Sequence, residues 1–231
     1  MPPKWLHQGQ LRHEEIETLY PSIRHMPLTK IVVSNVAGAT VQERLNAFLP
    51  TLSAKPALEY LVSSAERAGL RNAYRSSAQL GSDRFASAIA ARSLFPNQHL
   101  IIATFGTATT IDAVNAESVF EGGMILPGLR LMLESLSQKT AQLPAVNEGT
   151  AVHSLFATTT DQAIISGCIS AQAGAIERAV HAKSSAANLQ VRCLVTGGAA
   201  SAIAPHLAIA HQLLDNLVLI GLHVVAQSRA D

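Results

Sequence analysis

The chain has 231 residues, of which 48% are hydrophobic and only 14% are charged, so it can bury a substantial core and is neither a disordered protein nor a highly charged scaffold. Its 17 basic and 16 acidic residues leave a formal net charge of +1, with no long basic run, which argues against strong non-specific binding to nucleic acid or anionic lipid. Aromatic residues amount to 4%, too few to predict an aromatic platform for single-stranded nucleic acid.

Strands and helices are predicted to alternate along the chain. Apolar and β-branched runs predict strands over residues 30–36, 58–62, 99–104, 109–114, 119–126 and 192–196. Helical spacing predicts helices over residues 41–49, 83–94, 129–139, 159–181, 199–207 and 216–227. This order is typical of an α/β fold with a mixed sheet. We place a domain boundary near Pro96–Asn97, which gives domains of residues 1–97 and 98–231.

The turn that follows the strand over residues 99–104 is a candidate phosphate site. Gly106 permits a tight turn and a close approach of the backbone to a ligand. The hydroxyl of Thr107 and the neighbouring amides can hold phosphate oxygens. The same residues also fit an ordinary hairpin rich in β-favouring threonines. The turn is not a P-loop, because the pattern G-x-x-x-x-G-K-[ST] is absent.

Further candidates lie where helices are predicted to begin. Asp83 and Arg84 open one helix, and a carboxylate beside a guanidinium can act as a base and an anion anchor; a helix cap with a surface ion pair also explains them. Gly197–Gly198 joins a strand to a helix, either as a plain connection or as a turn that a phosphate or a flat ring can approach. Gly122–Gly128 is interpreted as structural. The nine histidines do not cluster, so no metal ligand is assigned.

Six segments, taken in order, resemble the type III pantothenate kinases, in particular the branch that includes the Bvg accessory factors. The segments are Arg71–Tyr74, Leu80–Arg84, Phe105–Asp112, Gly122–Gly128, Thr160–Gly167 and Val195–Gly198. No single motif is specific, but the ordered set is. The resemblance implies the duplicated ribonuclease-H-like fold of the acetate kinase, sugar kinase, Hsp70 and actin superfamily, and a homodimer.

The resemblance also implies an activity, the ATP-dependent phosphorylation of pantothenate to 4'-phosphopantothenate, the first step of coenzyme A synthesis. Asp83 would be the base that takes the proton from the pantothenate hydroxyl, and Arg84 would anchor the carboxylate. The pantothenate site would be lined by Tyr74, Gly81, Ser82, Asp83, Arg84 and Thr160. ATP, together with Mg²⁺, would be bound by Gly106, Thr107, Gly197 and Gly198, with Thr107 at the phosphates and the last two glycines near the adenosine. Phosphoryl transfer needs such positioning more than covalent help.

Two departures from the family pattern bear on this activity. Many members have an aspartate before the hairpin glycine, in D-x-G-T, which binds a monovalent cation. Thr104 stands there in this chain, which argues against a tight K⁺ or NH₄⁺ site. The family's opening turn, D-x-G-N-[TS], which holds ATP phosphates and Mg²⁺, is missing. Lys4–Trp5 resembles the end of the family's second strand, and Pro2–Pro3 cannot sit in a central strand.

We therefore expect a first domain that is truncated at its N-terminus, with its first strand pair incomplete by roughly 15–20 residues. One hypothesis is a type III pantothenate kinase read from a late start. The alternative is a non-catalytic homologue that acts as a binding or regulatory accessory protein, because the ATP phosphate motif is missing.

Cysteine usage and the chain start predict the compartment. Cys168 and Cys193 form no C-x-x-C pair and no metal-type cluster, which is typical of a reducing, cytoplasmic setting. The first residues lack the charged and apolar regions of a signal peptide. No run of about 18 apolar residues occurs, so no membrane span is expected. The expected partners are pantothenate, ATP and a second copy of the chain, rather than nucleic acid or a membrane.

Overall fold

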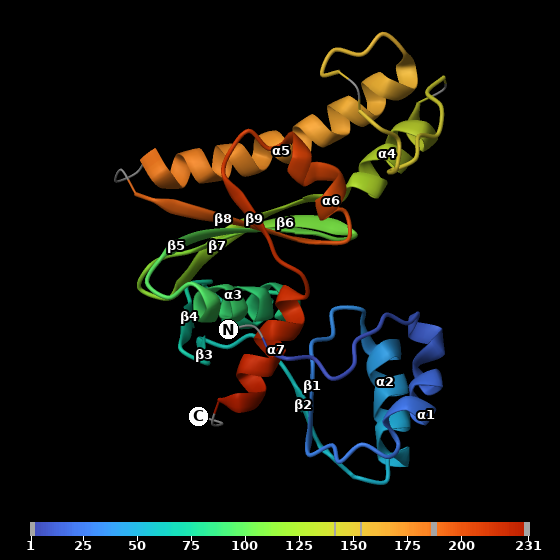
Figure 1. The fold of residues 1–231 in the computed structure, drawn as a ribbon, viewed down its shortest axis with the longest axis vertical. Coiled ribbons are helices and arrows are strands. Elements are labelled where there is room, and N and C mark those ends of the chain that lie inside the picture. The colour runs from blue at the N-terminus through green and yellow to red at the C-terminus, as the bar shows by residue number, and fades with distance from the viewer. Residues whose placement is uncertain (1–2, 141, 153, 186–188, 229–231) are drawn as a thin grey trace. The chain divides into compact units, whose positions relative to one another are not determined.

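The computed structural model describes residues 3–140, 142–152, 154–185 and 189–228. These residues form two compact units (Figure 1). Unit 1 combines the described residues of 1–94 with those of 218–231, and unit 2 comprises those of 95–217. The division into ribonuclease-H-like domains at residues 97 and 98 stays a prediction. The expectation for Pro2 falls outside the described residues.

Unit 2 is built on a mixed sheet. Its strands are β5 (His99–Phe105), β6 (Ala108–Val114), β7 (Val119–Pro127), β8 (Val191–Gly197) and β9 (His211–Leu213). They lie in the order β7-β6-β5-β8-β9; β7, β6 and β5 are antiparallel neighbours, whereas β5, β8 and β9 run parallel. Apolar residues fill the central strand β5, where Leu100, Ile102 and Ala103 are fully buried.

One face of this sheet is covered by helices (Figure 1). They are α4 (Leu129–Lys139), α5 (Thr160–Ser185), α6 (Ala200–Ile203) and the 3₁₀ turn η4 (Ala204–His206). Alternate strand residues such as Ile101 and Val195 pack with Ile165 of α5 in one core cluster. The helix predicted over residues 199–207 is divided because Pro205 has no N–H with which to continue the α-helical hydrogen bonds.

Unit 1 begins with a small group of elements around two parallel strands. The strands are β1 (Lys30–Val33) and β2 (Ala57–Tyr60), and the helical segments are η1 (His13–Leu19), α1 (Tyr20–Ile23), α2 (Ala39–Phe48) and η2 (Leu49–Thr51). The buried core of this group consists of Ile16, Phe48, Leu49 and Leu52. The strand predicted over residues 30–36 is thus shorter than expected, and η1 and α1 were not predicted.

The rest of unit 1 packs around a buried helix. Its elements are β3 (Glu66–Arg67), β4 (Leu70–Asn72), η3 (Ser77–Gln79), α3 (Ser82–Leu94) and nearly all of α7 (Leu217–Gln227). Small residues such as Ala86 and Ala88 leave α3 narrow, and both are fully buried. A Cβ added at Gly221 of α7 would lie 2.9 Å from the Cα of Ala86. Glycine at position 221 therefore lets the last helix lie directly against the backbone of α3.

One prediction for the start of the chain is wrong. Residues 3–12 contain no strand, so Lys4–Trp5 is not the end of one. The strands that the structure describes pair with one another, so these residues lack the ladder that a β-strand needs. The Trp5 ring instead packs edge-on against His223 of α7, with 6.5 Å between ring centres.

Among the helices that the structure describes, none is both long enough and apolar enough to cross a membrane.

Candidate active site

Asp83 lies in the first turn of α3. The carbonyl of Gly81 accepts a hydrogen bond from the N–H of Phe85 at 3.0 Å, which closes this turn. Oδ1 of Asp83 accepts a hydrogen bond from the N–H of Arg84 at 2.8 Å. A Cβ at position 81 would lie 2.7 Å from this Oδ1, so glycine there leaves room for the carboxylate. The helix start therefore holds the carboxylate in a fixed position, where a negative charge is also favoured by the helix dipole.

Arg84 is buried and bonded to Tyr74. The residue is 7% exposed, and Nη1 donates a hydrogen bond to the Tyr74 hydroxyl at 3.1 Å. The guanidinium carbon lies 5.9 Å from the centre of the Tyr74 ring, a cation–π distance. The N–H of Tyr74 donates to Oδ1 of Asn72 at 3.0 Å, which fixes the turn that carries it. The predicted pantothenate residues that lie together in unit 1 are thus Tyr74, Gly81, Ser82, Asp83 and Arg84.

Ser34 belongs to the same cluster and was not predicted. Its hydroxyl oxygen lies 2.8 Å from that of Ser82, and the two are hydrogen-bonded. Ser34 comes directly after Val33, the last residue of β1. The strand predicted from the sequence continued to Val36, so Ser34 was expected inside it. In the structure Ser34 follows the end of the strand, where functional side chains commonly lie.

The turn between β5 and β6 in unit 2 is shaped by Gly128 more than by Gly106. A Cβ at position 106 would meet only the Ala108 carbonyl oxygen, at an ordinary 3.6 Å. A Cβ at position 128 would lie 2.5 Å from the Thr107 carbonyl oxygen, which accepts a hydrogen bond from the N–H of Gly128 at 3.0 Å. Close approach to this turn therefore requires glycine at position 128, whereas the turn leaves room for a Cβ at position 106. The Thr107 side chain is left exposed.

A second close approach places the end of β8 beside this turn. Gly197 has φ = +100°, and a Cβ there would lie 2.7 Å from the backbone nitrogen of Phe105. Both the left-handed conformation and the contact require glycine. Gly198 has open space around its Cα. Because Phe105 and Gly197 are register partners, the four predicted ATP residues lie at the same end of the sheet: Gly106, Thr107, Gly197 and Gly198.

Three threonines form a row across the sheet next to these turns. Thr104 is the register partner of Thr110 on β6 and of Thr196 on β8. The Thr110 hydroxyl is buried and has no hydrogen-bond partner among the described residues. Thr104, where the resemblance implies a cation-binding aspartate, is therefore flanked by hydroxyl groups. Over the described part of the chain, no group of three or more His, Cys, Asp or Glu side chains could hold a metal ion.

The remaining predicted residue and the two thiols are placed as follows. Thr160 is the first residue of α5 and is exposed. Cys168 and Cys193 are free and buried. Burial raises the pKa of the Cys193 thiol to about 12, and it raises the pKa of Cys168 as well. Since the thiolate is the reactive form, neither cysteine is suited to act as a nucleophile.

Comparison with known proteins identifies the family. The family model for type III pantothenate kinase matches residues 6–182, more than half of the chain. The chain belongs to the type III pantothenate kinase family. It is 52% identical to the type III pantothenate kinase of Janthinobacterium sp. (strain Marseille), an alignment that covers 97% of this chain and 88% of the relative. It is 50% identical to that of Herminiimonas arsenicoxydans, again over 97% of this chain and 88% of the relative.

Solved structures support the fold of this pantothenate kinase. A Baf family protein from Campylobacter jejuni superposes with a TM-score of 0.51 at 20% identity and covers 86% of this chain and 82% of its own. A protein from Sinorhizobium meliloti named for 2-dehydro-3-deoxygalactonokinase also has a TM-score of 0.51, at 11% identity, over 94% of this chain and 85% of its own. The predicted family and the predicted superfamily fold are confirmed. The enzyme is a kinase, and its family phosphorylates pantothenate with ATP in coenzyme A synthesis.

Proposed function

We propose that the cluster around Asp83 binds pantothenate and that the glycine turns of unit 2 bind ATP. The observation that carries this proposal is the state of the Asp83 carboxylate. Oδ1 is occupied by the N–H of Arg84, whereas Oδ2 accepts no hydrogen bond from any described residue. A carboxylate held by one oxygen presents the other to a substrate hydroxyl. Asp83 then acts as the general base that takes the proton from the pantothenate hydroxyl as the phosphoryl group is transferred.

Arg84 anchors the pantothenate carboxylate. A guanidinium presents a rigid fork of N–H donors that matches a carboxylate, and its bond to the Tyr74 hydroxyl restricts the orientation of that fork. Burial strengthens the attraction, since water screens the pair less. Ser82 contributes a hydroxyl group to the same substrate, and the role of Thr160 stays a prediction. Gly81 keeps a Cβ away from the Asp83 carboxylate.

The ATP phosphates bind at the exposed Gly106–Thr107 turn, with the adenosine near Gly197–Gly198. The fit rests on two features of unit 2: the exposed Thr107 hydroxyl and the open space at Gly198, where a ligand can approach the backbone. Neither turn contains a carboxylate, so at these turns Mg²⁺ would be held by phosphate oxygens and water, the ligands that this ion usually keeps beside one or two carboxylates. Mg²⁺ supplies neutralisation of the charge that develops on the phosphoryl group.

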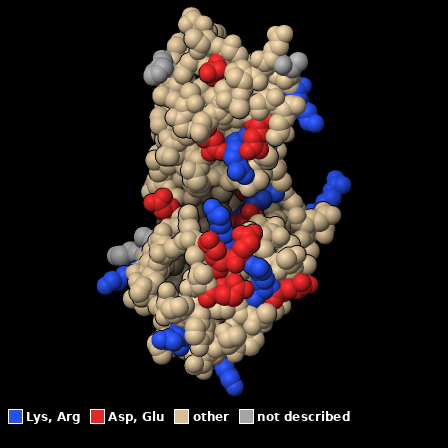
Figure 2. All heavy atoms as spheres, turned by 90° about the vertical axis from the view of Figure 1, so that its right-hand side faces the viewer, with Lys and Arg blue, Asp and Glu red and all other residues tan. Residues whose placement is uncertain are grey.

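The assembly and the compartment are also part of the proposal. Exposed apolar side chains on β7 and α4, namely Met124, Ile125 and Leu131, support a homodimer interface. The free cysteines support a reducing compartment, the cytoplasm. Acidic and basic side chains are intermixed on the face drawn in Figure 2, which supports partners other than nucleic acid or a membrane surface.

Pantothenate-dependent release of ADP tests the role of Asp83. The change is Asp83→Asn, which keeps size and hydrogen bonding but removes the base; we expect kcat to fall by about 10²- to 10⁴-fold with an unchanged melting temperature. The matched control is Asp215→Asn, at an exposed loop position, and it should keep full activity.

Two results would count against the proposal. A folded Asp83→Asn variant with kcat within about threefold of the wild-type value would show that Asp83 is not the base. No ADP release from folded wild-type protein would favour the non-catalytic accessory protein.

A further inference from the structure

A polar pocket lies at the amino ends of the parallel strands of unit 2. Its volume is about 760 Å³, within the usual range of small-molecule sites. His99 and Val191 begin β5 and β8 as register partners, and Phe105 and Gly197 end the paired stretch. Six residue steps along a strand correspond to roughly 20 Å. The pocket is therefore a full strand length from the glycine turns to which ATP is assigned.

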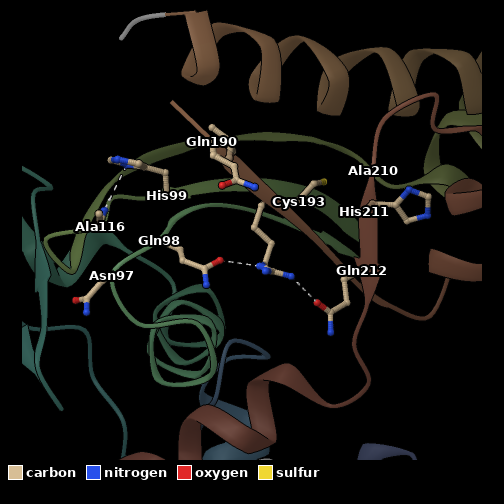
Figure 3. A pocket seen from close by; sticks show the side chains of 11 residues that line it. Asn97, Gln98, His99, Ala116, Gln190, Cys193, Ala210, His211 and Gln212 are labelled. Atoms are coloured by element: carbon tan, nitrogen blue, oxygen red, sulfur yellow. Dashed lines mark hydrogen bonds between the residues drawn. The ribbon is translucent and has the colours of Figure 1, made fainter. Parts of the chain in front are cut away.

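Strand alternation places four polar residues of this pocket on one face of the sheet. Gln190 and Arg192 are two residues apart on one chain segment, and Arg192 is the register partner of Leu100, two residues after Gln98. Gln212 is paired with Leu194, which shares a face with Arg192. In Figure 3, the side chains of Gln98 and Gln212 extend from two segments toward the same part of the pocket, and the Gln190 side chain lies above it.

Arg192 lies in this part of the pocket and has no counter-ion among the residues that the structure describes. Its Nε donates a hydrogen bond to Oε1 of Gln98 at 2.7 Å, and its Nη1 donates to Oε1 of Gln212 at 3.1 Å. The guanidinium carbon lies 4.7 Å from the centre of the Phe95 ring, a cation–π contact. The pocket lining contains no Asp or Glu, and within the described ranges Arg192 forms no ion pair. Three neutral groups thus orient a full positive charge.

Arg192 is exposed, but its contacts differ from those of an ordinary surface arginine. A solvated arginine keeps its rotamer freedom, and ordering one has an entropic cost. Here two hydrogen bonds and a ring contact hold the guanidinium, although neither acceptor neutralises the charge. The two bonds use two of the five N–H donors of the guanidinium. The carboxamides whose oxygens face Arg192 also carry NH₂ groups, and Gln190 adds another.

We propose that this pocket binds a small metabolite through an oxyanion, either a phosphate group or a carboxylate, with Arg192 as its anchor. A guanidinium fork binds both groups in a bidentate manner. The carboxamides of Gln98, Gln190 and Gln212 supply hydrogen bonds to the rest of the ligand. This site is separate from the proposed roles of Asp83 and of the glycine turns, and it stands or falls independently of them.

The test is a titration of the full-length enzyme followed by amide NMR. Inorganic phosphate and acetate are the two probes, each added at constant ionic strength and in the presence of a saturating non-hydrolysable ATP analogue, which occupies the nucleotide site. The N–H of Ala116 lines the pocket and bonds to Nδ1 of His99, so its signal reports on binding there. We expect saturable shifts at Ala116, Arg192 and Gln212, and the probe that gives them identifies the oxyanion.

Two variants and one control decide the assignment. Arg192→Gln removes the charge, and Gln212→Glu places a carboxylate against the guanidinium and neutralises it; each should weaken binding by about tenfold or more. The control is Arg130→Gln, an exposed arginine of α4 that pairs with Glu134. It removes the same charge elsewhere on unit 2 and should leave the affinity unchanged.

Three results would overturn the proposal. The first is an absence of saturable shifts for both probes with the wild-type enzyme. The second is undiminished binding by folded Arg192→Gln or Gln212→Glu protein, which melting temperatures would establish as folded. The third is an equal loss of affinity in Arg130→Gln, which would indicate general charge attraction rather than a site.

Discussion

The two ends of the unit 2 sheet are held together by different kinds of contact. At the carboxyl ends of β5 and β8, backbone meets backbone: Gly128 lies against the Thr107 carbonyl, and Gly197 lies against Phe105. At the amino ends, side chains meet side chains, and Arg192 is clamped by Gln98 and Gln212. The carboxyl end requires positions that have no Cβ, whereas the amino end requires particular side-chain functional groups.

This difference determines which substitutions each end tolerates. A backbone contact has no room for any side chain, so even alanine disrupts it. A side-chain clamp at an exposed strand end can lose its members one at a time without a clash. We therefore expect substitutions at the glycine end to destabilise the fold. Substitutions in the arginine clamp are expected to weaken ligand binding instead.

Alanine at Gly197 should give the largest effect on stability. The new Cβ would clash with Phe105 and would hold a left-handed conformation, at a total cost on the order of 3 kcal/mol. Gly198→Ala is the neighbouring control, because its Cβ enters open space and should change stability by about 0.5 kcal/mol or less. Urea denaturation of both variants measures the two values. Equal stability of the two variants would contradict the proposed backbone contact.

Cys193, at the amino end of the sheet, should make stability depend on pH in the alkaline range. Burial raises the pKa of its thiol from 9.0 to about 12 in the folded protein. Below pH 9 both states keep the proton; above it the unfolded state loses the proton first, so stability falls by about 1.4 kcal/mol per pH unit until pH 12.

The Cys193→Ala variant isolates this contribution. The wild-type protein should lose about 1.4 kcal/mol more than the variant between pH 8 and pH 10, measured by urea denaturation at each pH. Cys168→Ala keeps the Cys193 thiol and serves as the control. Parallel pH curves for the wild type and Cys193→Ala would show that the thiol is not shielded from water.

The smallest effect concerns monovalent cations at the glycine end. Thr104 lies between Thr110 and Thr196, and neutral hydroxyls hold K⁺ more weakly than a carboxylate does. Kinase activity should therefore be the same in KCl, NH₄Cl and NaCl at equal ionic strength. Thr104→Asp should introduce a dependence on K⁺ that the wild-type enzyme lacks. A wild-type enzyme that is active only with K⁺ would show that the threonines bind the ion.

The same contrast explains what the sequence could predict. The glycine turns and Asp83–Arg84 lie in contiguous motifs, so their positions at strand and helix ends could be predicted. The Arg192 clamp draws its members from three distant segments, and β9 is a three-residue strand, His211–Leu213, without an apolar run. Neither the clamp nor β9 therefore has a contiguous sequence pattern from which it could be predicted. The need for glycine at position 128 could not be predicted, because a sequence shows that glycine is present but not which atoms it faces.

The packing of Gly221 against Ala86 has a consequence for the order in which the protein is made. Unit 1 includes α3 and residues from Val218 onward, whereas unit 2 lies between them in the chain. At 5–20 residues per second, the ribosome completes α7 roughly 7 to 27 s after α3. During that time unit 2 has its whole sequence available, while α3 has yet to meet its partner. The unit that begins the chain is thus the later one to be completed.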